Sequence, residues 1–409
     1  MNATIQCLCH VLNFKNYFQN RQLVYNDTYN KQCELTMEFY KLLNNIWKEP
    51  TYKKYYTPTD FKNCISKMNP LFQGIAANDS KDLIIFIYET IHNEINKINQ
   101  YNNKNDNFYI SDELAIFRNN YYLNNSSFLI DTFYFEQQSD LLCLNCKFNK
   151  TSYNIANIFI FPLEKVREYI ASRETNGFES VTLDNCFENY QEAEILLGQN
   201  QIYCNNCRQM SNAKTRNKIF TCPEVMTIIL NRGKGLEFDV NFEYPLLFDL
   251  EKYVVNKQYG NNYKYELICV LKHIGPSGMA GHFIAFCKSP VDNKWYCYND
   301  SDVSECFDPR NHKKLENESI PYVLFYQKIK IGKSNKITLF VNYLDKQLYV
   351  DVEKTIQIKD LINILNKNYN LPNNISLFLY KDNDAINLED NKTINFYNLV
   401  DETLITVVV

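Results

Sequence analysis

The chain has 409 residues, of which 45% are hydrophobic and 15% aromatic, and its formal net charge at pH 7 is −4. This composition excludes a disordered chain, and the length is sufficient for two or three domains. The 43 basic and 47 acidic residues nearly balance, so we expect neither nucleic acid nor a membrane as a partner. Apolar runs are far shorter than the ~20 residues of a membrane helix. Fourteen cysteines without a visible secretory signal indicate the reducing cytoplasm or nucleus.

The first 100 residues are predicted to be mostly helical. Apolar residues fall on one helix face in two segments, Ile5-Leu8-Val11-Leu12 and Leu83-Phe86-Ile87-Ile91. From about 105 to 330 the pattern changes to short strands rich in β-branched and aromatic residues, such as 158–161 and 226–230.

A second, smaller domain is predicted after a polar linker at 329–336. Alternating apolar residues start again at Ile337, and a helical spacing runs from Ile358 to Leu365. Further alternating segments end the chain. Strand, strand, helix, strand, strand within about 75 residues is typical of a small α+β domain.

Two Cys-x-x-Cys pairs, Cys143 with Cys146 and Cys204 with Cys207, have the spacing of metal ligands. Four thiolates complete the tetrahedral coordination of Zn²⁺ and leave no open position, so the pattern predicts a structural zinc site. The alternative is a coincidence in a cysteine-rich chain, or two buried pairs. A redox role is disfavoured, because neither pair lies between a strand and a helix of a βαβ unit.

A histidine follows a glycine-containing loop at 275–281. Glycine lets a backbone approach an active centre or an extended substrate closely. His282 begins an alternating strand, and Asn299 ends the expected partner strand of a hairpin, so we expect Asn299 to orient the imidazole. These are two members of a Cys–His–Asn/Asp triad. The alternative is a structural histidine beside a glycine loop.

Together these motifs resemble the ubiquitin-specific protease family over nearly the whole of 1–328. The family's histidine box, HxG…GH[YF]…WY.[FY]ND, is matched by His273 to Gly275, Gly281 to Phe283 and Trp295 to Asp300. Its closing strand YVLFYxR is matched by Tyr322 to Lys328. Its helix pattern QQDAxEF…LHxE is matched by Asn78 to Leu83 and His92 to Glu94.

The resemblance implies an α+β, papain-like fold of thumb, palm and fingers, with zinc-ribbon fingers. The thumb would span about 1–104, and the fingers and palm about 105–328, with zinc at the finger tip. The resemblance also implies a catalytic role for His282, Asn299 and Asp300, and contacts of Asp79 and Gly281 with the extended tail of ubiquitin. Partners would be ubiquitin and ubiquitinated proteins.

The family's cysteine box, NTCYMN…LQCL, is matched only from its methionine onward, by Met1 to Leu8. The resemblance therefore puts the nucleophilic cysteine two residues before Met1, outside the 409 residues, and we expect the chain as given to be inactive. Cys7 cannot replace that cysteine, because it lies about 12 Å further along the helix at ~1.5 Å per residue. A thiol must come within ~3 Å of the histidine.

Residues 337–409 resemble ubiquitin-like domains of the β-grasp fold, most clearly at Ala385 to Asp390, Tyr397 to Leu399, and Thr403-Leu404. The chain ends at Val409 without a Gly-Gly tail. We therefore expect a built-in domain and not a conjugation tag, with a partner that the sequence does not identify.

Three functions remain open. The first is a deubiquitinating cysteine peptidase whose start lies upstream of Met1. The second is an inactive pseudo-protease that binds ubiquitin as a scaffold or competitor. The third is an unrelated structural zinc protein. A gene sequence with Asn-x-Cys-Tyr in frame before Met1 would separate the first from the second.

Overall fold

The structure is a computed structural model that describes residues 1–409 except 30, 48–55, 75–77, 98–112, 174–179, 234–239, 258–261, 278–279, 311–318, 330–335, 345, 370, 373–374, 382–383, 398, 400–402 and 409. Its contacts divide the chain into two compact units, Met1–Ile329 and Lys330–Val409. Most of the expected linker, and Gly278 of the glycine loop, lie outside the described residues. No helix in the described part is long and apolar enough to cross a bilayer. The expected α+β fold is confirmed.

Helices dominate the start of the first unit, as the apolar periodicity predicts. They are α1 Asn2–His10, α2 Leu12–Gln19, α3 Arg21–Thr28, α4 Glu34–Ile46, α5 Thr59–Met68, the 3₁₀ turn η1 Pro70–Phe72, and α6 Ser80–Ile95. The prediction of one continuous face through Leu12 is wrong. Val11 is extended, with ψ 115°, and separates α1 from α2, so Leu12 starts a new helix and is 38% exposed.

Residues 105–330 contain helices that the sequence analysis did not predict. They are α7 Glu113–Tyr122, α8 Phe128–Phe133, α9 Leu163–Ala171 and α10 Leu183–Tyr190. None is longer than ten residues, and α7 has no buried residue, so it lacks the apolar face on which the prediction depended. A capping box at Thr182 and Asn185 starts α10, and this local signal was present in the sequence.

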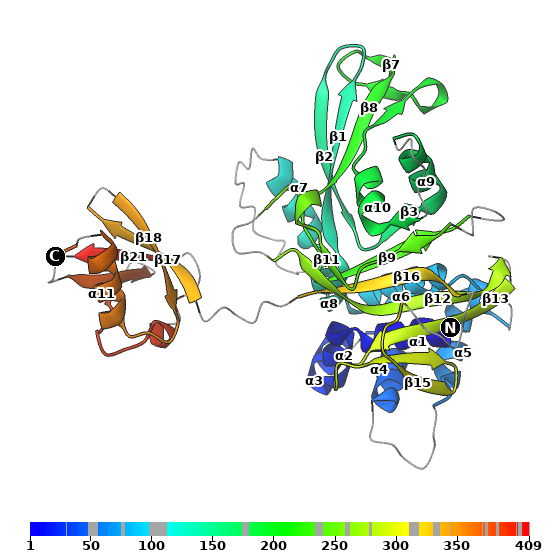
Figure 1. The fold of residues 1–409 in the computed structure, drawn as a ribbon, viewed down its shortest axis with the longest axis horizontal. Coiled ribbons are helices and arrows are strands. Elements are labelled where there is room, and N and C mark those ends of the chain that lie inside the picture. Colours follow the sequence, from blue (N-terminus) through cyan, green and yellow to red (C-terminus); the bar gives the residue numbers. More distant parts are fainter. Residues whose placement is uncertain are drawn as a thin grey trace. The chain divides into compact units, whose positions relative to one another are not determined.

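An eight-stranded sheet forms the centre of the first unit (Figure 1). Its order is β15-β14-β13-β12-β16-β9-β3, and β11 also pairs with β12. The strands are β3 Phe159–Pro162, β9 Val225–Asn231, β11 Leu247–Asp249, β12 Lys264–Ser277, β13 Ala280–Lys288, β14 Trp295–Asn299, β15 Asp302–Cys306 and β16 Ser319–Lys328. Both faces are buried: Cys269 and Leu271 of β12 join the core that contains α1 to α6, whereas Val270 joins the core beneath α9 and α10.

A second sheet projects from this centre, away from α1 to α5 (Figure 1). Its order is β2-β1-β8-β5, formed by β1 Phe135–Cys143, β2 Asn149–Ala156, β5 Glu194–Leu196 and β8 Ala213–Ile219. The hairpin of β6 Ile202–Cys204 and β7 Gln209–Ser211 lies near its end. The short strands β4 Val181–Thr182 and β10 Phe242–Glu243 pair in parallel elsewhere.

The described part of the second unit has a five-stranded mixed sheet, one α-helix and the 3₁₀ turn η6 Ile394–Tyr397. The strand order is β18-β17-β21-β19-β20, and β17 and β21 pair in parallel. The elements are β17 Lys336–Tyr343, β18 Lys346–Glu353, α11 Ile358–Tyr369, β19 Ser376–Lys381, β20 Asp384–Asn387 and β21 Leu404–Val408. The predicted inward residues Ile337, Leu339 and Val341 are buried with Leu361 and Leu365 of α11.

Candidate functional site

His282 lies on β13 with its side chain 46% exposed, not in the apolar core. Its Nε2 is 2.7 Å from Oδ1 of Asn299, at the end of β14. The antiparallel pairing of β13 with β14 brings the two residues together. An amide oxygen can only accept, so Nε2 carries the proton and donates it. The lone pair of the neutral ring is then on Nδ1, where it can accept a proton from a nucleophile.

Asp300 adds a carboxylate beside this pair, with Oδ2 3.7 Å from His282 Nε2. It begins the tight turn between β14 and β15 and has φ of 51°, a left-handed conformation that Asp tolerates better than most residues. Its Oδ1 accepts a 2.7 Å hydrogen bond from Nδ2 of Asn2, in the first turn of α1. The His282 site is therefore tied to the start of α1.

The Met1 amino group lies near the Asp300 carboxylate. Burial lowers its pKa below the ordinary value, and the nearby Asp300 carboxylate opposes that shift. By contrast, the two cysteines of α1, Cys7 and Cys9, are fully buried. The N-terminal end of α1 thus faces Asp300 with backbone and amide groups, and with no thiol of the 409 residues.

The backbone of Gly281, next to His282, lies so close to the His273 ring and the Ile274 carbonyl that no side chain fits at this position. A Cβ atom at this position would lie 2.2 Å from His273 Nε2 and 2.4 Å from the Ile274 carbonyl oxygen. The His273 ring packs edge-on against Phe283 at 4.9 Å. The site therefore requires glycine at position 281 for packing alone, whatever its contact with a substrate.

We expect Gly281→Ala to lower the free energy of unfolding by ~1–3 kcal/mol, the usual cost of overpacking. The ring of His273 could rotate away, but the Ile274 carbonyl is held by the pairing of β12 with β13. Thermal unfolding measures the effect. Ser301→Ala, at an exposed turn position, is the control and should change stability by less than ~0.5 kcal/mol. Equal melting of the two variants would contradict the close approach.

Asp79 occupies the N-cap of α6, where its side chain accepts from the backbone N–H of Lys81 at 2.9 Å. Its other carboxylate oxygen accepts a 2.8 Å hydrogen bond from the Tyr322 hydroxyl. The Tyr322 ring packs edge-on against Phe283 at 5.3 Å, and Phe283 adjoins His282. The capping role is therefore present, and Asp79 is also linked through two aromatic rings to the His282 strand.

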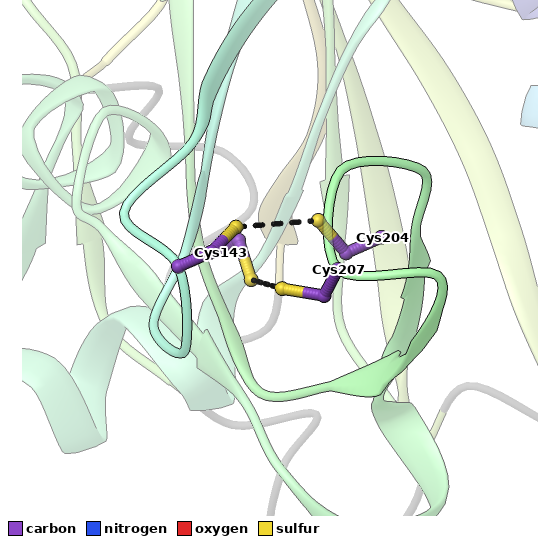
Figure 2. Close-up of side chains that lie close together, drawn as sticks. Cys143, Cys204 and Cys207 are labelled. Carbon is purple, nitrogen blue, oxygen red and sulfur yellow. Dashed lines mark hydrogen bonds between the residues drawn. The ribbon is translucent and has the colours of Figure 1, made fainter.

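The four cysteines of the Cys-x-x-Cys pairs come together at the end of the projecting sheet. Their sulfur atoms all lie within 4.8 Å of one another, with Cys143 to Cys207 at 3.6 Å and Cys146 to Cys204 at 3.7 Å. Metal–sulfur bonds of ~2.3 Å in a tetrahedron imply S···S edges of about 3.8 Å. The cluster can therefore hold a tetrahedral metal ion, and Figure 2 shows Cys204 and Cys207 on one loop facing Cys143 on the other.

The two loops share one backbone geometry. Lys147 N donates to the Cys143 carbonyl at 2.9 Å, and Arg208 N donates to the Cys204 carbonyl at 2.7 Å. Both donors follow the second cysteine and have left-handed φ values of 62° and 56°. Two independent loops with the same turn are expected where each presents two thiolates to one ion. Asn145 also donates to Cys207 Sγ at 3.6 Å, the kind of outer-shell bond that orients a ligand.

Two residues of the site were not singled out from the sequence. Asn2 and Asp300 are 298 positions apart, and Tyr322 and Asp79 are 243 apart. Neither pair has a local spacing that predicts contact. Tyr322 belongs to the closing-strand motif, and the available signal was that a tyrosine on a buried strand needs a partner for its hydroxyl.

Comparisons of the sequence with a family profile and with curated proteins point to the same family. The sequence profile described as "Ubiquitin carboxyl-terminal hydrolase" matches residues 1–326. Ubiquitin carboxyl-terminal hydrolase 2 of Bos taurus is 26% identical over 340 residues, covering 80% of this chain and 53% of that protein. Its Homo sapiens counterpart is 27% identical over 341 residues, with the same coverage. The chain thus spans about half the length of these curated relatives.

Solved structures support the fold. The SAGA DUB module Ubp8/Sgf11/Sus1/Sgf73 bound to ubiquitin aldehyde matches with a TM-score of 0.58 and 19% identity, covering 81% of this chain and 68% of that chain. The module bound to monoubiquitin matches with a TM-score of 0.60 and 20% identity, covering 81% and 67%.

Proposed function

The chain belongs to the ubiquitin carboxyl-terminal hydrolase family. We propose that it forms the catalytic domain of a deubiquitinating cysteine peptidase whose nucleophile lies upstream of Met1. The reaction is hydrolysis of the peptide or isopeptide bond that follows the C-terminal glycine of ubiquitin. The observation that carries the proposal is the His282–Asn299 hydrogen bond of 2.7 Å beside the start of α1. His282 takes the proton of a thiol through Nδ1, Asn299 holds the ring, and Asp300 ties the site to α1.

The nucleophile in this proposal is a cysteine joined to the N-terminal end of α1, ahead of Met1. All fourteen cysteines of the sequence are in the described part, and each is free. Cys7 and Cys9 have no exposed surface, and the two Cys-x-x-Cys pairs are at the other end of the unit. A thiol at the end of α1 would gain from the helix N-terminus and from His282, both of which favour the thiolate. The test is the activity of an extended chain, described in the Discussion.

The second candidate is a ubiquitin-binding protein that does not cleave. It needs the family fold and a surface for ubiquitin, and it does not need a nucleophile beside His282. The structural neighbours include complexes with ubiquitin, and binding surfaces can outlast catalysis. A cysteine codon in frame before Met1, in an Asn-x-Cys-Tyr context, would reject this candidate.

We further propose that the four-cysteine cluster binds Zn²⁺ as a structural ion. Four thiolates leave no position for a reacting water, so the ion would hold the two loops together and take no part in hydrolysis. We also propose that residues 337–409 form a built-in ubiquitin-like domain of the β-grasp fold, supported by the order β18-β17-β21-β19-β20 and its parallel central pair. A location in the cytoplasm or nucleus fits fourteen free cysteines.

Asp79 is proposed to bind the extended tail of ubiquitin, in addition to capping α6. Asp79→Ala should weaken ubiquitin binding roughly 10- to 150-fold, because a hydrogen bond from a peptide to a carboxylate is worth ~1.5–3 kcal/mol. Asp79→Ser is the matched variant, since serine caps a helix nearly as well as aspartate. Titration calorimetry with ubiquitin should show a similar loss for both. Wild-type affinity of Asp79→Ser would leave only the capping role.

A further inference from the structure

Three thiols from distant parts of the chain meet beneath α1. Cys7 lies on α1, Cys269 on β12 and Cys287 on β13, and their sulfur atoms are all within 4.8 Å of one another. Cys269 and Cys287 are directly opposite in the antiparallel pairing of the two strands. Each of the three has no exposed surface, and each is a free cysteine. The cluster is separate from the His282 site and from the four-cysteine loops.

The surroundings of this cluster are apolar. All three cysteines belong to the core formed by the first helices and one face of the central sheet. The buried cation Lys272 of β12 points to the other face, toward the Phe286 ring at 5.0 Å. The thiol of Cys269 is directed at the Cys7 carbonyl oxygen, at 3.5 Å. Three mutually close thiols are more than packing requires, because any small apolar side chain would fill the same space.

We propose that Cys7, Cys269 and Cys287 form a three-sulfur binding site for a trivalent thiophilic ion, of which trivalent arsenic is the accessible example. Thiolates are soft ligands and select soft ions. Among the residues that the structure describes, the group able to hold an ion here has three members, whereas Zn²⁺ in structural sites takes four ligands.

Charge balance selects among soft ions. Three thiolates with a monovalent ion such as Cu⁺ would leave two negative charges in an apolar core, which is costly without a paired cation. With trivalent arsenic the adduct is neutral. The reaction is As(OH)₃ + 3 Cys–SH → As(S–Cys)₃ + 3 H₂O: three As–O bonds break, three As–S bonds form, and each thiol proton leaves with a hydroxide as water. Arsenic stays trivalent, so no oxidant or reductant is needed.

Occupancy would fasten α1 to β12 and β13. Asn2, in the first turn of α1, donates a hydrogen bond to Asp300. The ion would therefore fix the helix that borders the His282 site. Because the three sulfurs are buried, entry requires α1 to separate transiently from the sheet. Binding should therefore be slow and should raise the melting temperature, since the ion binds only the folded arrangement.

The experiment incubates the zinc-loaded 409-residue protein with sodium arsenite, removes free arsenite by gel filtration, and measures arsenic and zinc per chain. We expect one arsenic per chain with zinc retained, and three sulfur neighbours around arsenic by X-ray absorption. Cys269→Ala and Cys287→Ala should each reduce retained arsenic at least tenfold while still unfolding cooperatively. Cys186→Ala removes a buried cysteine of the other core and should bind like the parent protein.

Three results would overturn the proposal. The first is retention of arsenic by both cluster variants at the level of the parent protein. The second is retention accompanied by zinc release, which would place arsenic at the four-cysteine loops. The third is no retained arsenic in folded, zinc-loaded protein even after refolding with arsenite present, which would leave the three cysteines as packing residues.

Discussion

Replacing Cys204 by serine is expected to abolish zinc retention and to lower the melting temperature by roughly 10 °C or more. Structural zinc contributes an apparent ~10–16 kcal/mol in small zinc-finger peptides, and each lost kcal/mol lowers the melting temperature by ~2–4 °C in domains of 150–250 residues. The loop hairpin has little else to hold it: β6 and β7 are three residues long, and Tyr203 and Met210 are exposed.

Zinc per chain and thermal unfolding are the measurements, and a strong chelator should have the same effect on the parent protein. Cys64→Ser is the control, because Cys64 is a partly exposed free cysteine outside the cluster. A Cys204→Ser protein that melts with the control and keeps its zinc would refute the four-thiolate site.

Replacing His282 by alanine is expected to lower kcat/KM about 10³- to 10⁴-fold, measured in a chain that carries a cysteine ahead of Met1. General acid–base catalysis contributes ~10²–10⁴, and here the same imidazole would also activate the thiol. The ring is partly exposed, so its removal should leave stability and ubiquitin affinity nearly unchanged. Asp302→Ala, two residues beyond Asp300 at an exposed position of β15, is the control.

Asn299→Ala should have a smaller effect on kcat/KM than His282→Ala, because Asn299 orients the ring and does not exchange the proton.

If His282→Ala retained more than about a tenth of the activity, another group would be the base, and the assignment of His282 would fail.

Local sequence patterns predicted much of the fold and part of the site. The two Cys-x-x-Cys pairs specify tight turns, and the structure gives both turns the same backbone bond. The strand alternation after His282 predicted a hairpin that brings Asn299 close, and the distance is 2.7 Å. The catalytic role of the pair stays a prediction.

Contacts between distant segments could not be predicted in this way. Asn2 with Asp300, Tyr322 with Asp79, and the trio of Cys7, Cys269 and Cys287 depend on how α1 and α6 pack on the central sheet. That packing results from burial summed over many residues, not from a local spacing. The break at Val11 was missed for a related reason: apolar spacing continues through it, while the backbone turns there to α2.

The proposed function depends on a thiol at the N-terminal end of α1, and one assay tests it. A fluorogenic ubiquitin C-terminal substrate is incubated with the 409-residue chain and with a chain extended upstream through Asn-x-Cys-Tyr. We expect no turnover by the first and thiol-dependent turnover by the second, lost again when the added cysteine is replaced by alanine. Turnover by the 409-residue chain that disappears in Cys7→Ala or Cys9→Ala would contradict the account, because it would put the nucleophile inside the core.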